Sequence, residues 1–261
     1  MIRNGDTAQR PWLRFVAPAL AVVGLAVWEF QARRGAVSTL FFPAPSVILA
    51  NVVEMSRGGK LATDVGVTVL QLLAGFVLGG SAGLVLGMLM GWSQTARRIL
   101  DPFVAAAHPV PKISTFPLIL LIFGIGMFSR TLVVAISAFF PMLLNTMAGV
   151  RQISPIYYEV AKNYGATGWQ VFTRVVLPGS LPLVLTGARL ALNRALSITI
   201  AVELLMGENG LGTLIWYSWE TLRVEDLYAT ILVVSVLGIG FRWAIALATD
   251  WLTPWQVERS A

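Results

Sequence analysis

An uncharged stretch of 28 residues, Val65–Trp92, constrains this chain more than any other feature of its sequence. An α-helix rises about 1.5 Å per residue, so a helix of this length exceeds the roughly 30 Å hydrocarbon core of a bilayer. The whole chain has the same character, since 56% of its 261 residues are hydrophobic, 12% are charged and the mean hydropathy is +0.74. A soluble domain carries about a quarter charged residues. The sequence therefore predicts an all-α integral membrane protein.

Other apolar blocks predict six spans within one transmembrane domain, residues 12–250, with short polar tails at 1–11 and 251–261. The spans are expected at residues 12–30, 65–92, 101–128, 131–150, 181–206 and 227–249. Four prolines and Lys112 predict an interrupted third span, because each proline removes a backbone donor. Irregular backbone is tolerated at membrane depth only against protein or a polar cavity. Residues 92–100 are expected to form a short turn, and short surface helices are expected at 46–55 and 213–223.

Glycines recur at every fourth position of the second predicted span: Gly75, Gly79, Gly83, Gly87 and Gly91. This spacing places them in one slowly winding groove, where another helix backbone can approach closely. The pattern favours helix packing, with a pore-lining stripe as the alternative.

Several function classes are excluded by composition. The chain has no cysteine and one histidine, His108, so it offers no disulfide, thiolate site or multi-histidine metal centre. The net charge of +6 is spread singly or in pairs, unlike the basic, aromatic-interleaved surfaces that bind nucleic acid. An intramembrane enzyme needs a nucleophile–base pair within the spans, and none is evident, so no catalytic residue is predicted.

Polar side chains inside the predicted spans are candidates for a translocation pathway, because charges at membrane depth are costly and must face protein or water. The candidates are Asn145, Arg189, Asn193 and Glu203. Arg189 and Asn193 share one helix face by their four-residue spacing. Glu203 is expected near an outer gate beside the turn-rich segment 207–212. The alternative for Arg189 and Arg194 is that they snorkel or brace the segment before their span.

That segment, residues 154–178, is the one long mixed polar and apolar stretch between hydrophobic blocks, and it is called the elbow below. Ser154 is expected to cap a helix over 155–164, and Gly165 is expected to end it. Thr167 is expected to cap a second short helix through Val176, closed by Pro178. The pattern predicts a helix–glycine–helix surface offered to another protein, with an ordinary connecting loop as the alternative.

Within the elbow, Glu159, Ala161, Gly165, Val175, Leu177 and Pro178 stand at the spacing of the EAA signature. The chain thereby resembles the inner-membrane permease subunits of ABC importers, with Val160 and Val175 as mild departures. The resemblance implies a six-span type I importer fold, in which the elbow is the cytoplasmic coupling helix that fits a separate ATPase subunit. The implied ATPase-coupling residues are Tyr158, Glu159, Ala161, Lys162, Gly165, Ala166, Leu177 and Pro178.

The same resemblance implies partners. They are a second permease chain, expected to be identical, two ATPase subunits that carry ATP and Mg, and a periplasmic or lipid-anchored substrate-binding protein. No phosphate loop of the form G-x-x-x-x-G-K-[ST] occurs in the sequence, so this chain is expected to bind no cofactor itself.

Residues 177–216 resemble the branch that imports nitrate, sulfonates, taurine or bicarbonate. The alternatives are a pyrimidine, riboflavin or aromatic-acid permease, or a secondary transporter that works alone. Orientation follows from basic residues, nine on the elbow side against six on the other. A bacterial inner-membrane protein with both ends cytoplasmic is expected, although the Arg33-Arg34 pair on the opposite side opposes that count.

Overall fold

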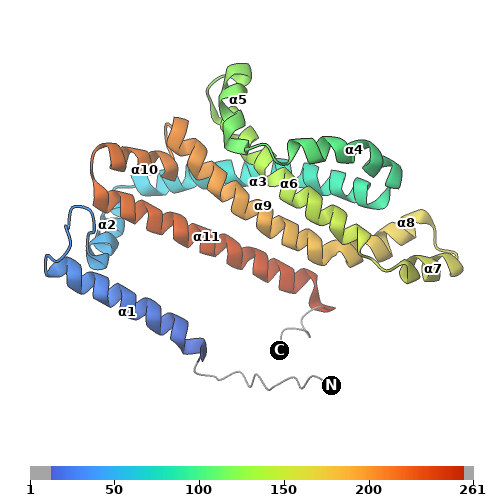
Figure 1. Cartoon of the computed structure of the whole chain (residues 1–261), viewed down its shortest axis with the longest axis horizontal. Coiled ribbons are helices and arrows are strands. Elements are labelled where there is room, and N and C mark those ends of the chain that lie inside the picture. The colour runs from blue at the N-terminus through green and yellow to red at the C-terminus, as the bar shows by residue number, and fades with distance from the viewer. Residues whose placement is uncertain (1–12, 256–261) are drawn as a thin grey trace.

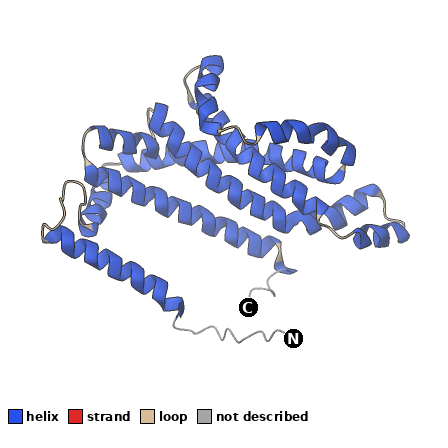
Figure 2. Cartoon of the chain, in the orientation of Figure 1, coloured by secondary structure: helices blue, strands red, loops and turns tan. Residues whose placement is uncertain are grey.

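The computed structural model describes residues 13–255, and every element in this range is helical (Figures 1 and 2). The predicted N-terminal tail, residues 1–11, and residues 256–261 of the predicted C-terminal tail at 251–261 lie outside the described residues. The helices are α1 (Leu13–Arg33), α2 (Pro45–Arg57), α3 (Lys60–Trp92), α4 (Gln94–Ala107), η1 (Lys112–Thr115), α5 (Phe116–Phe123), α6 (Met127–Arg151), α7 (Pro155–Asn163), α8 (Gly168–Val171), η2 (Phe172–Val176), α9 (Leu177–Met206), α10 (Leu211–Glu220) and α11 (Val224–Leu252).

Five helical segments between residues 13 and 255 are long and apolar enough to cross a membrane, and a sixth candidate is bent by 87°. The bent one consists of α4 followed by η1 and α5, which confirms the predicted interruption of the third span. Figure 1 shows α7 and α8 at one end of the bundle and α2 and α10 at the other. Trp255 lines a cavity together with Ser154 and Tyr157, so the described C-terminal end lies on the elbow side.

The core is the contact between α3 and α6, which buries more of α6 than of any other spanning segment described. A Cβ built on Gly79 would lie 1.8 Å from the Ala135 carbonyl oxygen, and one on Gly83 would lie 2.5 Å from that of Phe139. Gly75, Gly87 and Gly91 meet α6 at similarly short distances. The stripe is therefore where two helix backbones touch, as its spacing predicts.

Two features near α3 differ from the sequence expectations. The helix that contains the predicted span at 65–92 begins earlier, at Lys60, and the carboxylate of Asp64 within it is buried and accepts a hydrogen bond from the backbone NH of Gly210. The expected turn at 92–100 is also absent, since α4 begins at Gln94. Ser93 alone separates the two helices, and its hydroxyl accepts a hydrogen bond from the Ala96 NH as an N-cap.

The sequence predicted that Pro178 would end the second elbow helix, and this prediction is wrong. The chain passes from α8 through the π-helical turn η2 directly into α9. A proline clashes with the carbonyl four residues earlier in a regular helix, and a wider turn relieves that clash. The predicted fifth span thus continues the elbow without a break, and Gly168–Met206 forms one helical segment.

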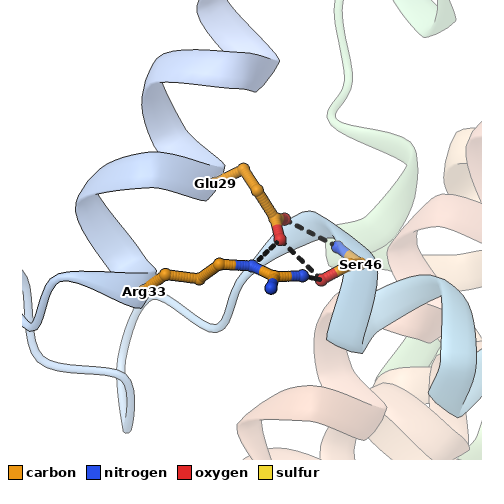
Figure 3. A network of polar contacts seen from close by, with 3 residues as sticks. All are labelled: Glu29, Arg33 and Ser46. Atoms are coloured by element: carbon orange, nitrogen blue, oxygen red, sulfur yellow. Dashed lines mark hydrogen bonds and ion pairs between the residues drawn. The ribbon is translucent and has the colours of Figure 1, made fainter.

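α1 is attached to the rest of the chain through α2 by a polar network (Figure 3). The Glu29 carboxylate accepts hydrogen bonds from the Ser46 backbone NH at 3.0 Å and from its hydroxyl at 2.7 Å, and it pairs with Arg33. Glu29 thereby caps the N-terminus of α2. The network therefore holds the end of α1 against the start of α2.

Candidate functional site: the elbow and the faces of α9

The elbow has the helix–glycine–helix geometry that its sequence predicts. Gly165 has φ +70, and a Cβ built on it would meet no atom within 4 Å. The Thr167 hydroxyl accepts a hydrogen bond from the Gln170 NH, and the Gln170 side chain accepts one from the Thr167 NH. This reciprocal capping box fixes where the second helix starts. Ser154 occupies the N-cap position of α7 and its carbonyl accepts from the Tyr157 NH, but its side chain makes no cap hydrogen bond, contrary to the prediction.

Most of the elbow is exposed. Glu159 and Lys162 are exposed and have no ion-pair partner within residues 13–255. Tyr164 is 88% exposed and Trp169 73% exposed. A large apolar side chain left so open beside unpaired charges is typical of a surface that another protein covers. Of the other residues implied by the resemblance, Gly165 and Leu177 are exposed, while Tyr158, Ala161, Ala166 and Pro178 are half-buried.

Trp92, the last residue of α3, packs against the elbow. Its ring lies 6.5 Å from that of Tyr158 and 5.8 Å from that of Phe172, so it contacts both elbow helices. Burial at this contact raises the pKa of the Tyr158 phenol, which keeps the hydroxyl protonated. A force on α7 therefore reaches the end of α3 through aromatic contacts.

At the other end of α9, Glu203 is fully buried in a polar cluster. Its Oε2 accepts hydrogen bonds from the Thr68 hydroxyl and the Gly212 NH, both at 2.9 Å. The Thr68 hydroxyl also accepts from the Leu211 NH. The prediction of Glu203 as a pathway residue needs correction, because this carboxylate joins α3, α9 and the start of α10 and faces no open space. Its donor Thr68, and Asp64, which accepts from the neighbouring Gly210 NH, had no signal in the sequence.

The other predicted pathway residues lie on two different faces. Arg189 and Asn193 are exposed on one face of α9, as their spacing predicts, and Ser197 continues that face. Asn145 lies instead at the contact between α6 and α9, where its amide donates to the Pro141 carbonyl at 2.8 Å. A Cβ built on Gly187 would lie 2.8 Å from the Cβ of Asn145, so that contact is tight.

A cavity of about 310 Å³ opens beside the exposed face of α9. Arg194, Ser197 and Ile198 of α9 line it, with Lys112 and its neighbours at the break between α4 and η1 on the opposite side. Ser137 and Phe140 of α6 close the remaining wall. Only a general signal for this region is visible in the sequence, where prolines and a lysine interrupt an apolar block.

The fold and the elbow together define a helical membrane permease. Residues 83–259 match the family described as the binding-protein-dependent transport system inner membrane component. The chain is 31% identical over 244 residues to the taurine transport system permease protein TauC of Escherichia coli, covering 92% of this chain and 88% of TauC. It is 30% identical over 239 residues to the formylaminopyrimidine transport permease protein ThiX of Halalkalibacterium halodurans, covering 90% and 93% respectively.

Among solved structures, the inward-facing MetNI methionine ABC transporter shares the fold, with a TM-score of 0.60 at 19% identity over 74% of this chain and 96% of that one. This chain therefore belongs to the family of inner-membrane permease components of binding-protein-dependent ABC importers. It is a transport subunit of the type I importer fold.

Proposed function

We propose that this permease carries a small anion across a bacterial inner membrane and that its elbow couples the movement to ATP hydrolysis in a separate ATPase subunit. Two copies of the chain form the pathway, two ATPase subunits bind ATP and Mg, and a periplasmic or lipid-anchored binding protein delivers the substrate. The elbow side, with both chain ends, is cytoplasmic. Nine basic residues against six favour this orientation, with the Arg33-Arg34 pair among the six.

The observation that carries the coupling proposal is the exposed, preorganised elbow. Its second helix is capped and its turn is fixed by Gly165, yet Glu159 and Lys162 have no ion-pair partner within the described chain. Trp169 stacks on Phe172 and still leaves 73% of its surface exposed. Because α8 continues through η2 into α9, a displacement of the elbow moves a helix that reaches the opposite face. Closing of the ATPase dimer would then bias the bundle between two states by differential contacts.

Replacing each of two matched glycines by proline tests this coupling. Gly165 and Gly59 have φ +70 and +73, both lie in open space, and their NH groups donate to Lys162 O and Ser56 O respectively. Gly165→Pro and Gly59→Pro therefore remove equivalent local structure at opposite faces. We expect both variants in the membrane at comparable levels, with substrate-stimulated ATPase activity and uptake lost only in Gly165→Pro. Full stimulated hydrolysis and uptake in that variant would reduce the elbow to a loop.

Anions are favoured as substrates because the cavity beside α9 is lined by Arg194 and Lys112 and by no acidic residue. The second candidate is an uncharged pyrimidine, favoured by the similarity to ThiX. Uptake of radiolabelled taurine, an alkanesulfonate, nitrate and uracil into vesicles with the complete importer separates the two. Preferential uptake of uracil would overturn the anion assignment.

A further inference from the structure

We propose that the cavity between the α4–η1 break, α6 and α9 is a binding station for an organic anion with an apolar body, and that Arg194 holds the anionic group. The inference rests on the proposed function, because it assigns the site within that pathway. It goes further in naming the residue that selects charge and in separating organic anions from nitrate, bicarbonate and zwitterions.

Arg194 lies deep in the membrane and is unpaired. At about 1.5 Å per residue it is about 25 Å along α9 from Leu177 and about 18 Å from Met206. Within residues 13–255 its guanidinium has neither an ion pair nor a hydrogen bond, although it lines the cavity. A guanidinium offers five donors in a planar fork that matches sulfonate or carboxylate oxygens. An unpaired arginine at this depth is costly unless water or a ligand meets it.

Lys112 contributes positive charge in a different way. Its ammonium donates to the carbonyl oxygens of Ala107, His108 and Val110 at 2.7, 3.0 and 2.7 Å, which uses all three of its donors. These carbonyls are left free where α4 ends, and uncovered they would make the cavity wall attractive to cations. Lys112 therefore satisfies the carbonyl groups at the break and makes the local potential positive without pairing with a carboxylate.

The remaining lining selects the body of the ligand. The apolar walls are Val110, Ile113, Phe140, Pro141 and Ile198, and the uncharged polar groups among them are the His108 imidazole and the hydroxyl groups of Ser137 and Ser197. A volume of about 310 Å³ is that of a small-molecule site. A bare inorganic anion is comparable to one or two water molecules, roughly 30 Å³ each, and would leave most of the cavity filled with water.

Zwitterions are disfavoured by the same lining. No Asp or Glu side chain lines the cavity, so an ammonium group has no counter-ion there. The Phe140 ring already has the Lys112 ammonium 4.3 Å from its centre and the His108 ring 5.4 Å away, so its face is not free for a second cation. An alkanesulfonate or a monocarboxylate with a hydrocarbon tail matches both the positive and the apolar walls, whereas taurine leaves its ammonium without a counter-ion.

The chain has no cysteine, so Ser197→Cys introduces a single thiol into the cavity wall. In the complete importer this thiol is treated with methanethiosulfonate reagents carrying either a sulfonatoethyl or a trimethylammonioethyl group. The thiolate attacks the sulfenyl sulfur, a disulfide forms and methanesulfinate leaves, and the mass of the intact chain reports the extent. The ratio of the two rates measures the local potential without requiring transport.

We expect the sulfonate reagent to react faster, and Arg194→Gln to lower the rate ratio on the order of tenfold, the size of effect for one nearby charge at an effective dielectric of about 20. Arg194→Lys should retain most of the ratio. Arg242→Gln, which removes an exposed arginine from α11 away from the cavity, should leave the ratio within about twofold of the parent. An unchanged ratio in Arg194→Gln would overturn the assignment of Arg194.

Protection of the same thiol tests the ligand class with Arg194 intact. Butanesulfonate should slow its modification more than taurine, nitrate or uracil at equal concentration, and equal or better protection by any of these three would overturn the class. Val110→Cys, on the opposite wall, serves if Ser197→Cys does not accumulate. These readings need no hydrolysis or uptake, so failure of the elbow experiment and failure of the cavity experiment are separate results.

Discussion

The elbow and the turn between α9 and α10 are both glycine turns next to the same long segment, yet they satisfy their polar groups in opposite ways. At Gly165 the surroundings are empty and the nearby charges have no partner within the described residues. At Gly210, which has φ +121, a Cβ would lie 2.5 Å from the carboxyl carbon of Glu203. The NH groups of Gly210, Leu211 and Gly212 all donate to side chains of α3 or α9.

The difference separates stability from function along one helix. The α9–α10 turn uses its hydrogen-bonding capacity inside the chain, so it contributes to folding and has little left for a partner. The elbow leaves Glu159 and Lys162 without an ion-pair partner in the described chain and leaves Tyr164 and Trp169 exposed, so it contributes less to folding and, under the proposed function, keeps these groups for a partner. Substitutions at the α9–α10 turn should reduce the amount of protein in the membrane, and substitutions at the elbow should reduce coupling.

The largest effect is expected from Glu203→Ala. The Thr68 hydroxyl and the Gly212 NH lose their buried acceptor, and a cavity replaces the carboxylate, which together cost about 3 kcal/mol or more. Membrane abundance and the apparent Tm in mild detergent should both fall. Glu208→Ala removes an exposed acid from the same turn and should behave as wild type. Equal Tm values for the two variants would show that the cluster does not stabilise the fold.

Alanine at the two turn glycines sharpens the comparison. Gly165→Ala meets only the backbone cost of a positive φ, about 1 kcal/mol. Gly210→Ala meets that cost and also a collision with Glu203, for a total of about 3 kcal/mol. Thermal unfolding of the purified chain in detergent ranks them. A Gly165→Ala variant as unstable as Gly210→Ala would mean that the elbow is held as tightly as the opposite turn.

Charge reversal at the elbow should separate coupling from stability. Glu159→Lys changes an exposed residue, so its effect on unfolding should stay within about 0.5 kcal/mol. Stimulated ATPase activity and uptake should fall together, by about tenfold or more, if the acid meets a partner. The matched control is Glu220→Lys, an exposed acid at the end of α10 on the opposite face. If both reversals reduce uptake equally, the loss is not a property of the elbow.

The smallest effect is expected from loss of the elbow cap. Thr167→Ala removes the capping box, at a local cost of about 1 kcal/mol. The second elbow helix should fray at its start, and uptake should fall by about two- to fivefold at unchanged abundance. Thr173→Ala, whose hydroxyl donates to the Trp169 carbonyl and caps no helix start, is the control. A larger loss in Thr173→Ala than in Thr167→Ala would contradict the importance of the cap.

The spans, the elbow turn and the packing face of α3 could be predicted from short stretches of the sequence. Long uncharged runs set the spans, because a bilayer admits few charges. Gly165 and Thr167 marked the elbow turn, because a left-handed residue and an N-cap are requirements of a few neighbouring residues. The glycine stripe of α3 indicated its own packing face, since its spacing repeats with the helix. Each of these signals is complete within about thirty residues of sequence.

The tertiary structure decided what depended on distant partners. Glu203 was predicted to lie near a gate because it stands beside a glycine-rich turn. The structure shows that the Gly212 NH of that turn and the Thr68 hydroxyl, 135 positions away, both donate to its buried carboxylate. The predicted second span starts directly after Asp64, because that residue is charged. The structure shows that the Asp64 carboxylate is buried and accepts from the Gly210 NH, 146 positions away. Lys112 and Arg194 stand in separate blocks and meet at one cavity only because α4 breaks there. The sequence shows which polar groups need partners, and the packing of the helices determines which groups those partners are.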